Sequence, residues 1–183
     1  MNPLATFALA ERLQVGDGAP LGEVFSFLSG LYFRGKLAYA GAFGRDSRDT
    51  PASWIITTDR GLVPPERAVR RDDLVAFSRV DIASGDERYV APLRRDAEQL
   101  ASTIGTKTRV ILLGSIATGK YADILTGVFE DRLLFPIEFV GRGDMSRGGL
   151  LLRHALAGRE LEYQPVLGAI RRGKRPPKLG RPL

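Results

Sequence analysis

The chain has 183 residues, which is enough for one domain with a sizeable core and marginal for two. It has no cysteine and one histidine, His154, which excludes disulfides, cysteine-ligated metals and mechanisms that need two histidines. No stretch approaches about 18 apolar residues, and the N-terminus lacks a basic segment followed by a long apolar one. We therefore expect no membrane span, no secretion signal, no metal and no other cofactor, and a cytoplasmic location.

The formal net charge is +6, and the excess lies entirely at the C-terminus. Residues 171–183 hold six of the 27 basic side chains and no acidic one, so 21 basic residues balance the 21 acidic ones elsewhere. Proline and glycine make this segment a poor helix or strand. We expect a single domain over residues 1–170 and a basic tail over residues 171–183 that lies along DNA phosphates. The predicted phosphate contacts in the tail are Arg171, Arg172, Lys174 and Arg175. A tail that only keeps the protein soluble is the alternative.

Hydrophobic spacing and turn residues predict the elements of the first half of the chain. Residues 6–11 are expected to form a short strand, and residues 15–20 a turn with two glycines, an aspartate and a proline. The apolar, aromatic stretch 23–44 fits a helix in its second half. Residues 53–58, SWIITT, are typical of a buried strand. The mixed, polar segment 71–90 is interpreted as a loop region.

The second half alternates more regularly. A helix is predicted over residues 91–104, where apolar residues recur at helical spacing, and a buried strand over residues 108–115, TRVILLGS. A helix over residues 118–129 and a strand over residues 132–141 follow. In that strand Pro136 indicates an edge position or a bulge.

The segment 141–149, GRGDMSRGG, is expected to be a loop before a short helix that ends at Gly158, and residues 161–170 a last strand. Strands that alternate with helices predict an α/β fold, a three-layer sandwich with a mostly parallel central sheet. Ligands of such folds bind beyond the carboxyl ends of the strands. The loops that would meet at that edge begin at Asp17, Asp59, Ser115 and Arg142.

Residues 114–120, GSIATGK, match the G-x-x-x-x-G-K pattern of a phosphate-binding P-loop between a strand and a helix. Tyr121 follows where a P-loop enzyme needs Ser or Thr for magnesium, which disfavours a nucleoside triphosphatase. Backbone amides together with Ser115 and Lys120 can still hold a phosphate at a helix N-terminus. An ordinary strand-to-helix turn is the alternative.

The glycine-rich loop and the aromatic helix supply further candidates. Glycines let backbone amides converge on an anion, and Arg142 and Arg147 add fork-shaped donors, although a capped loop explains the same residues. Most aromatic side chains of residues 23–33 are expected in the core. Phe27 and Tyr32 are candidates to stack on a base.

Asp59 and Arg60 directly follow the predicted strand 53–58. A carboxylate that is buried without a partner costs several kcal/mol, so its presence there points either to a local Asp–Arg turn or to chemistry. In the functional interpretation Asp59 positions a water or stabilises a cationic transition state, Arg60 contacts phosphate, and Thr57 and Thr58 line the pocket. Asp17 is a second candidate for the same role.

Three segments in this order resemble those of a family of small bacterial and phage proteins: LYFRGKLAYA, WIITTDRGLVPPE and RVILLGSIATGKYADIL. In that family an LY-x-x-x-LF-x-x-A-x-x-YA helix precedes an ILSAKYGLL-x-P strand and a later VVVLAG-x-x-Y-x-x-L strand and helix. The peroxide-stress YaaA family has a similar YGLL strand end, and both groups look like distant relatives of the uracil-DNA glycosylase fold. Here Asp59 and Arg60 replace the family's lysine and tyrosine, and VGDGAP stands near the place of its Cys-Gly-Lys element.

The resemblance implies a uracil-DNA glycosylase-like fold and metal-independent cleavage of the N-glycosidic bond of a flipped base in double- or single-stranded DNA. By analogy, the target is a modified or damaged base, and the setting is defence against phages. Two alternatives stay open: a DNA-binding protein without catalytic activity on the same scaffold, and an enzyme that acts on free nucleotides.

Overall fold

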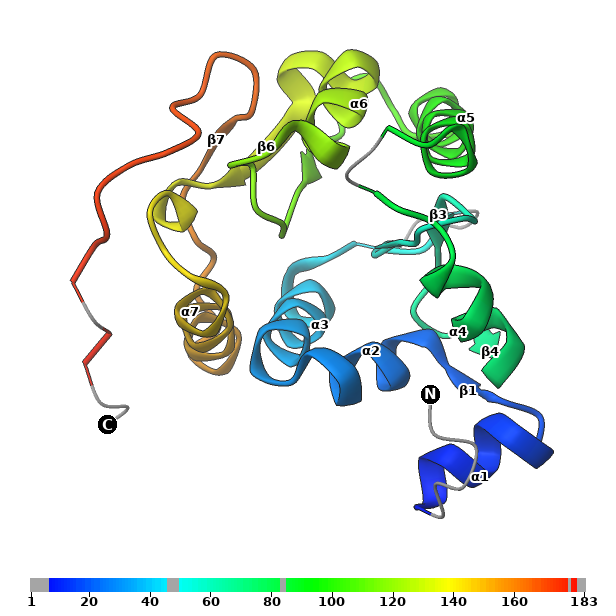
Figure 1. Ribbon diagram of the computed structural model, residues 1–183. Helices are drawn as coiled ribbons and strands as arrows, with labels where there is room; N and C mark the ends of the chain where they lie inside the picture. Colours follow the sequence, from blue (N-terminus) through cyan, green and yellow to red (C-terminus); the bar gives the residue numbers. More distant parts are fainter. Residues whose placement is uncertain (1–6, 46–49, 83–84, 178, 181–183) are drawn as a thin grey trace.

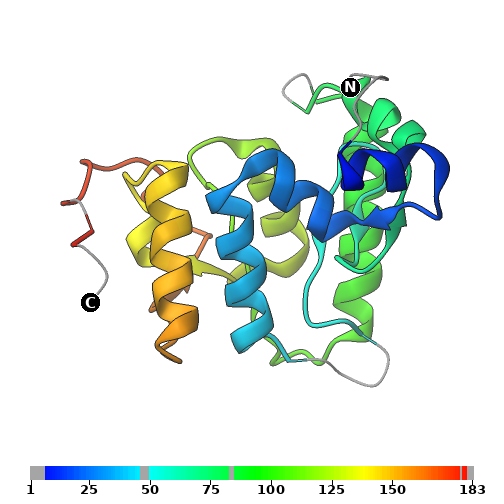
Figure 2. The same cartoon turned by 90° about the horizontal axis from the view of Figure 1, so that it is seen from below.

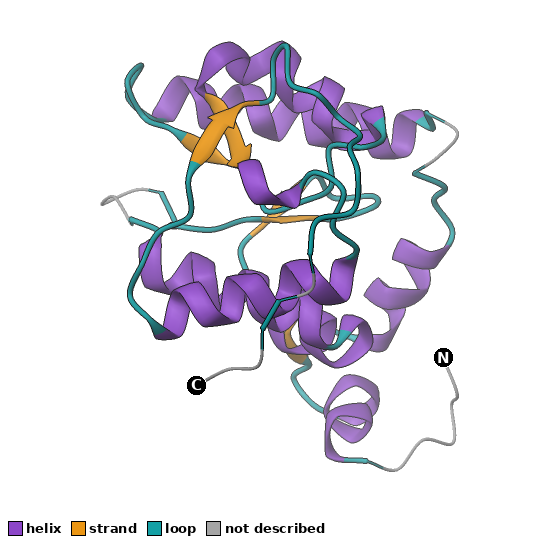
Figure 3. Cartoon of the chain, turned by 90° about the vertical axis from the view of Figure 1, so that its left-hand side faces the viewer, coloured by secondary structure: helices purple, strands orange, loops and turns teal. Residues whose placement is uncertain are grey.

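The structure, a computed structural model, describes residues 7–45, 50–82, 85–177 and 179–180. Within these residues seven α-helices and seven short strands form a mixed α/β fold, which confirms the predicted class. The three strands within residues 110–165 lie between two groups of helices (Figure 1 and Figure 3). Helices α5 (Glu87–Thr103) and α6 (Gly119–Phe129) form one group, and α2 (Leu21–Ser29), α3 (Leu31–Phe43) and α7 (Asp144–Leu156) form the other.

The strands of the first half form two antiparallel pairs. β1 (Ala19–Pro20) pairs with β4 (Ala68–Val69), and β2 (Ile55–Ile56) pairs with β3 (Leu62–Val63) across a tight turn. The predicted strand 53–58 therefore forms, but only its two isoleucines pair.

The third sheet has β6 (Leu133–Pro136) at its centre. β5 (Val110–Ile111) pairs with it in parallel and β7 (Tyr163–Pro165) pairs with it antiparallel. Among the described strands, the expected parallel pairing is therefore confirmed for β5 and β6 alone. The edge position expected from Pro136 is wrong, because this proline is the last residue of the central strand β6. The short helices η1 (Glu130–Arg132) and η2 (Ile137–Phe139) flank β6.

Three segments differ from the sequence prediction. Helix α1 (Ala8–Val15) forms where a strand was expected, because Ala10 and Leu13 are buried at helical spacing. Helix α4 (Arg71–Ser78) forms where a loop was expected, since the Asp73 carboxylate accepts a 2.7 Å hydrogen bond from the Arg70 amide and caps the first turn. Helix α7 begins at Asp144, so only the first three residues of the expected glycine-rich loop 141–149 precede it.

Helices α3 and α7 pack side by side through two glycines (Figure 2). A Cβ atom on Gly35 would lie 2.6 Å from the Gly148 carbonyl oxygen, and one on Gly148 would lie 2.7 Å from the Leu31 carbonyl oxygen. Both distances are shorter than real Cβ contacts, so no larger residue fits without a shift of one helix. The contact brings the residues around Gly35 next to the first turn of α7.

The core has two clusters of buried side chains. The larger one joins α3, α5, α6 and α7 to the third sheet and includes Tyr39, Leu93 and Phe135. The smaller one joins α1, α2 and α4 to the two antiparallel pairs and includes Leu21 and Val69.

We expect Gly35→Ala to lower the free energy of unfolding by about 1–3 kcal/mol, because the added methyl group overpacks the contact of α3 with α7. Gly41→Ala is the matched control in the same helix. A Cβ there meets nothing within 4 Å, and alanine favours helix, so this variant should gain up to about 1 kcal/mol. Urea denaturation measures both. Equal stability of the two variants would contradict the close helix contact.

Candidate functional site

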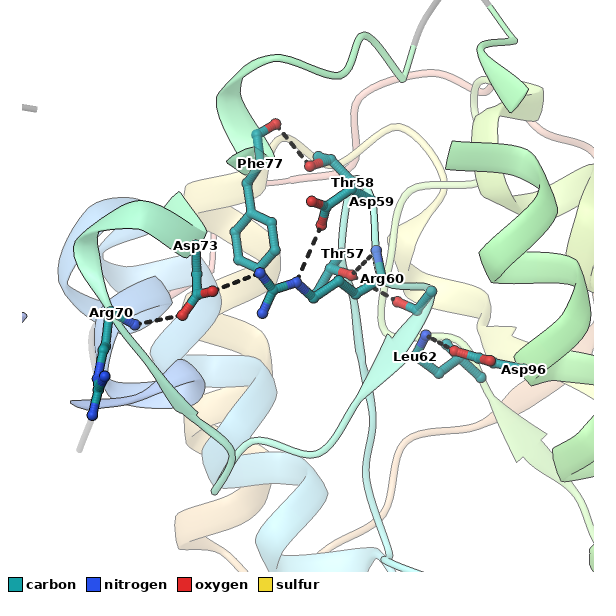
Figure 4. Close-up of polar contacts among 10 residues, drawn as sticks. Thr57, Thr58, Asp59, Arg60, Leu62, Arg70, Asp73, Phe77 and Asp96 are labelled. Carbon is teal, nitrogen blue, oxygen red and sulfur yellow. Dashed lines mark hydrogen bonds and ion pairs between the residues drawn. The ribbon is translucent and has the colours of Figure 1, made fainter. Parts of the chain in front are cut away.

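The turn after β2 is held from both sides by side-chain hydrogen bonds (Figure 4). The Thr57 hydroxyl donates to the Gly61 carbonyl oxygen over 3.1 Å and accepts from the Arg60 amide over 3.1 Å. Gly61 adopts a φ of +64°, and a Cβ there would overlap the backbone of α5. The Leu62 amide donates to the Asp96 carboxylate of α5 over 3.0 Å. The turn is therefore fixed to α5, and its two charged residues have a defined place.

Asp59, the first predicted catalytic carboxylate, is incompletely compensated on this turn. Its side chain is 20% exposed, and its Oδ1 atom is buried with no hydrogen-bond partner in the described part of the chain. Its ion pair with Arg60 is long, with Nε to Oδ1 at 3.8 Å, because the other side of the Arg60 guanidinium binds Asp73 at 2.5 Å. Burial therefore raises the pKa of Asp59, although Arg60 lowers it.

A cavity of about 790 Å³ lies beside this turn. In the described sheets β2 pairs only with β3, and β5 pairs only with β6, so β2 and β5 do not join. Residues 54–58 and 109–114 both line the cavity, and α3 lines it as well. Its wall is rich in aromatic side chains, namely Phe33, Tyr39, Phe43, Trp54, Tyr89, Tyr121, Phe129 and Tyr163.

Two buried polar atoms of the cavity residues have no hydrogen-bond partner within the described ranges: the Trp54 indole nitrogen and the Tyr89 hydroxyl. Burial raises the pKa of Tyr89 to about 12, so the hydroxyl stays protonated near neutral pH and can donate. A buried donor without an acceptor costs about 1–3 kcal/mol. A ligand with acceptor atoms would relieve that cost at both positions.

The structure separates the predicted pocket residues from the predicted carboxylates. Thr57 and Thr58 line the cavity, although the Thr58 hydroxyl is bonded to the Phe77 carbonyl oxygen at 2.7 Å. Asp59 follows directly but is not part of the wall. Asp17 is exposed between α1 and β1 and does not line the cavity either.

The predicted stacking residues lie on different helices. Phe27 is 59% exposed on α2 and stacks on Phe7 with ring centroids 5.0 Å apart, away from the cavity lining. Tyr32 lies on α3 and does not line the cavity, and its hydroxyl donates to the Leu113 carbonyl oxygen, just after β5, over 3.3 Å.

Lys36 is a cavity residue that the sequence analysis missed. Its Nζ atom lies 4.2 Å from the centroid of the Tyr32 ring, one helical turn away. Burial lowers the pKa of Lys36 to about 8, an effect that Asp144 opposes and Arg147 reinforces. The signal available in the sequence was a lysine directly before the apolar run LAYAGAF and shortly after the aromatic pair Tyr32 and Phe33.

Two predicted phosphate contacts hold the protein together instead. Arg147 is only 7% exposed, and its guanidinium donates twice to the Phe139 carbonyl oxygen, at 3.1 and 3.2 Å. Arg142 donates to the Ser146 hydroxyl at 3.3 Å and to the Pro177 carbonyl oxygen at 3.4 Å. Both side chains fix the start of α7 to its neighbours.

The GSIATGK turn does not form an open phosphate cradle. The Asp123 carboxylate folds back onto Gly119 in the first turn of α6, where it would overlap a Cβ atom, and forms an ion pair with Arg171. The Ser115 hydroxyl accepts from the Ala117 amide over 3.3 Å. Lys120 is exposed in the first turn of α6 and remains available to a ligand.

The basic tail begins as an ordered segment along the outside of the third sheet and the start of α7 (Figure 1). Arg171 forms an ion pair with Asp123, and the backbone of Lys174 packs on Gly141. The side chains of Arg172, Lys174 and Arg175 are exposed. Lys178 and Arg181, the other two basic residues of the tail, lie outside the described residues.

In the residues that the structure describes, no group of three or more His, Asp or Glu side chains could hold a metal ion. No helix of the described chain has both the length and the apolar character needed to cross a membrane. Comparisons with models of protein families, with curated protein sequences and with solved structures find no match.

We expect Arg60→Gln to lower the free energy of unfolding by about 1 kcal/mol at pH 7, since it removes an ion pair with Asp73 and the partner of Asp59. Burial alone would raise the pKa of Asp73, but hydrogen bonds from the Arg70 amide and the Arg60 guanidinium lower it overall. That stabilisation is present above the unfolded value of about 4 and is lost as the pH falls below it.

The difference between wild type and Arg60→Gln should therefore shrink below about pH 4 in urea denaturation. Arg67→Gln is the control, an exposed arginine with no ion pair in the described chain. A difference that does not change with pH would assign the effect to the packing of Arg60 on the Phe77 ring, 5.4 Å away.

Proposed function

We propose that this protein is a DNA glycosylase that takes a modified or damaged base, flipped out of DNA, into the cavity beside β2 and hydrolyses its N-glycosidic bond. The observation that carries the proposal is the aromatic wall of this cavity, together with the donors of Trp54 and Tyr89 that find no acceptor in the described chain. Modified bases, such as those of phage DNA, are the substrate class we propose, because altered pairing lowers the cost of flipping.

The size and walls of the cavity support a base as the ligand. A volume of about 790 Å³ lies in the range of small-molecule sites, about 300–1,000 Å³, and leaves room for a base that carries a substituent. Aromatic side chains suit a planar heterocycle, and base edges carry the acceptors that two buried donors lack. The placement of the strands between two helix groups is compatible with the three-layer, uracil-DNA glycosylase-like arrangement that belongs to this proposal.

Asp59 is the carboxylate that we assign to the reaction. Cleavage of the N-glycosidic bond leaves a positively charged, oxocarbenium-like sugar, which a carboxylate stabilises while water attacks. Asp59 adjoins Thr58 of the cavity wall and has one oxygen with no hydrogen-bond donor in the described chain. Asp17 lies exposed on another part of the molecule and becomes the control.

The exposed cations of the tail and α6 support binding of the DNA backbone. Arg172, Lys174 and Arg175 follow Arg171, which is anchored to the first turns of α6 by Asp123, and Lys120 lies in the same turns. Because this run of exposed cations is fixed at one end, less of the segment has to be ordered when it binds phosphates, which lowers the entropy cost of binding.

Asp59→Asn should abolish release of the base while DNA binding stays within about twofold, because the amide keeps the shape of the side chain and loses its charge. Asp17→Asn should act like wild type. The assay incubates the protein with DNA duplexes and single strands of differing base modification and measures free base and alkali-labile sites. If no DNA yields free base while free nucleotides are cleaved, the substrate is the nucleotide. Binding without any cleavage leaves only a DNA-binding protein.

Replacing Arg172, Lys174 and Arg175 together with glutamine should weaken DNA binding and reduce the slope of log K against log salt by about 2–3. The control replaces Arg67, Arg79 and Arg94 with glutamine. These substitutions remove the same total charge from exposed positions near β4, α4 and α5. Binding isotherms at several salt concentrations measure both slopes. Equal losses in the two triple variants would show an effect of net charge and not of the tail.

A further inference from the structure

We propose that Lys36 is a nucleophilic amine that forms a Schiff base with an aldehyde in the cavity. The inference rests on the proposed function for its natural partner, the ring-opened sugar that base removal leaves in DNA. It adds a covalent step to hydrolysis by water, and it assigns a role to a residue that the glycosylase proposal does not use.

The position of Lys36 separates it from the other lysines. Its half-buried side chain lines the cavity from α3, and it forms no ion pair in the described part of the chain. Of the other four lysines, Lys107, Lys120 and Lys174 are exposed and Lys178 lies outside the described residues. A buried lysine without a carboxylate partner is costly for stability, which points to a chemical role for its amine.

The helix contact holds this amine in place. Gly35, the preceding residue, is locked against Gly148, so the backbone of Lys36 cannot move away from α7. Its Nζ atom lies over the Tyr32 ring at 4.2 Å and 5.8 Å from the centroid of the Phe33 ring. Both rings hold the side chain in place, and as cation–π contacts they favour its protonated form, so the lowered pKa comes from burial.

Burial favours the neutral amine of Lys36. Burial is the main reason that the pKa of Lys36 falls to about 8, and the Arg147 guanidinium adds to it while Asp144 opposes it. Near pH 7 about one amine in ten is then unprotonated, compared with roughly one in several thousand for an ordinary lysine. The neutral amine is the reactive form, so a lower pKa increases nucleophilicity near neutral pH.

The step balances without any cofactor. The Lys36 nitrogen attacks C1′ of the aldehyde, the carbonyl electron pair moves to oxygen, and a proton passes from nitrogen to that oxygen. Loss of the oxygen as water gives the carbon–nitrogen double bond of the Schiff base. Cyanoborohydride, added as a reagent, delivers hydride to that carbon and converts the adduct into a stable secondary amine.

The test incubates the full chain with DNA that already contains an abasic site, in the presence of cyanoborohydride, and maps the adduct by peptide mass spectrometry. The Lys36 peptide should carry at least tenfold more adduct than the Lys107 or Lys120 peptide. Adduct formation should rise from pH 6 and level off above about pH 8, the pKa of the group. An adduct that maps to the tail lysines or the N-terminal amine, or no adduct at all, overturns the inference.

Lys36→Arg should reduce the amount of adduct at least tenfold, and Lys107→Arg, at an exposed lysine outside the cavity lining, should keep it, with thermal melting as the test of folding. The mapping on the wild-type chain decides the question even if the variant does not fold. Because the abasic site is preformed, the two proposals fail separately. Base release without a Lys36 adduct removes only the covalent step, whereas a Lys36 adduct without base release from any DNA removes only the glycosylase.

Discussion

The contact of Gly35 with Gly148 is the constraint on which the candidate site depends. It lets α3 and α7 approach until a Cβ atom on either glycine would touch the backbone of the other helix. One residue further along α3, Lys36 comes to face the cavity, and one residue before Gly148, Arg147 turns inward to the Phe139 carbonyl oxygen. A wider separation of these helices would expose the lysine and restore its ordinary protonation.

The cavity has a different origin, the absence of pairing between β2 and β5. Each of these strands bonds to one neighbour on its far side, so the space between them is filled by side chains and not by a ladder. Eight aromatic side chains line this space, and the donors of Trp54 and Tyr89 have no partner in the described chain, which favours a planar ligand with polar edges over an aliphatic one. The turn at Asp59 directly follows Thr58 of the cavity wall and is fixed to α5 through Asp96.

Hydrophobic spacing predicted the helices at α3, α5 and α6 and the strands at β5 and β6, since their burial repeats are local. It missed α4, whose signal was the polar cap at Asp73. The glycine-rich loop suggested that Arg142 and Arg147 bind phosphate, although both side chains form hydrogen bonds within the fold. The cavity and the burial of Lys36 were out of reach, because they depend on how distant segments pack. The distribution of charge could be predicted, because the tail contains cations and no acid.

The gap between β2 and β5 also connects ligand binding in the cavity with the stability of the fold. The two hydrophobic clusters belong to segments that share few ladder bonds, and the hollow lies where a continuous sheet would otherwise join them. A ligand that fills this cavity makes contacts that core side chains would otherwise make. Because it binds only the folded chain, its binding free energy adds to the free energy of unfolding. A ligand bound in this cavity would therefore raise the free energy of unfolding of the whole chain.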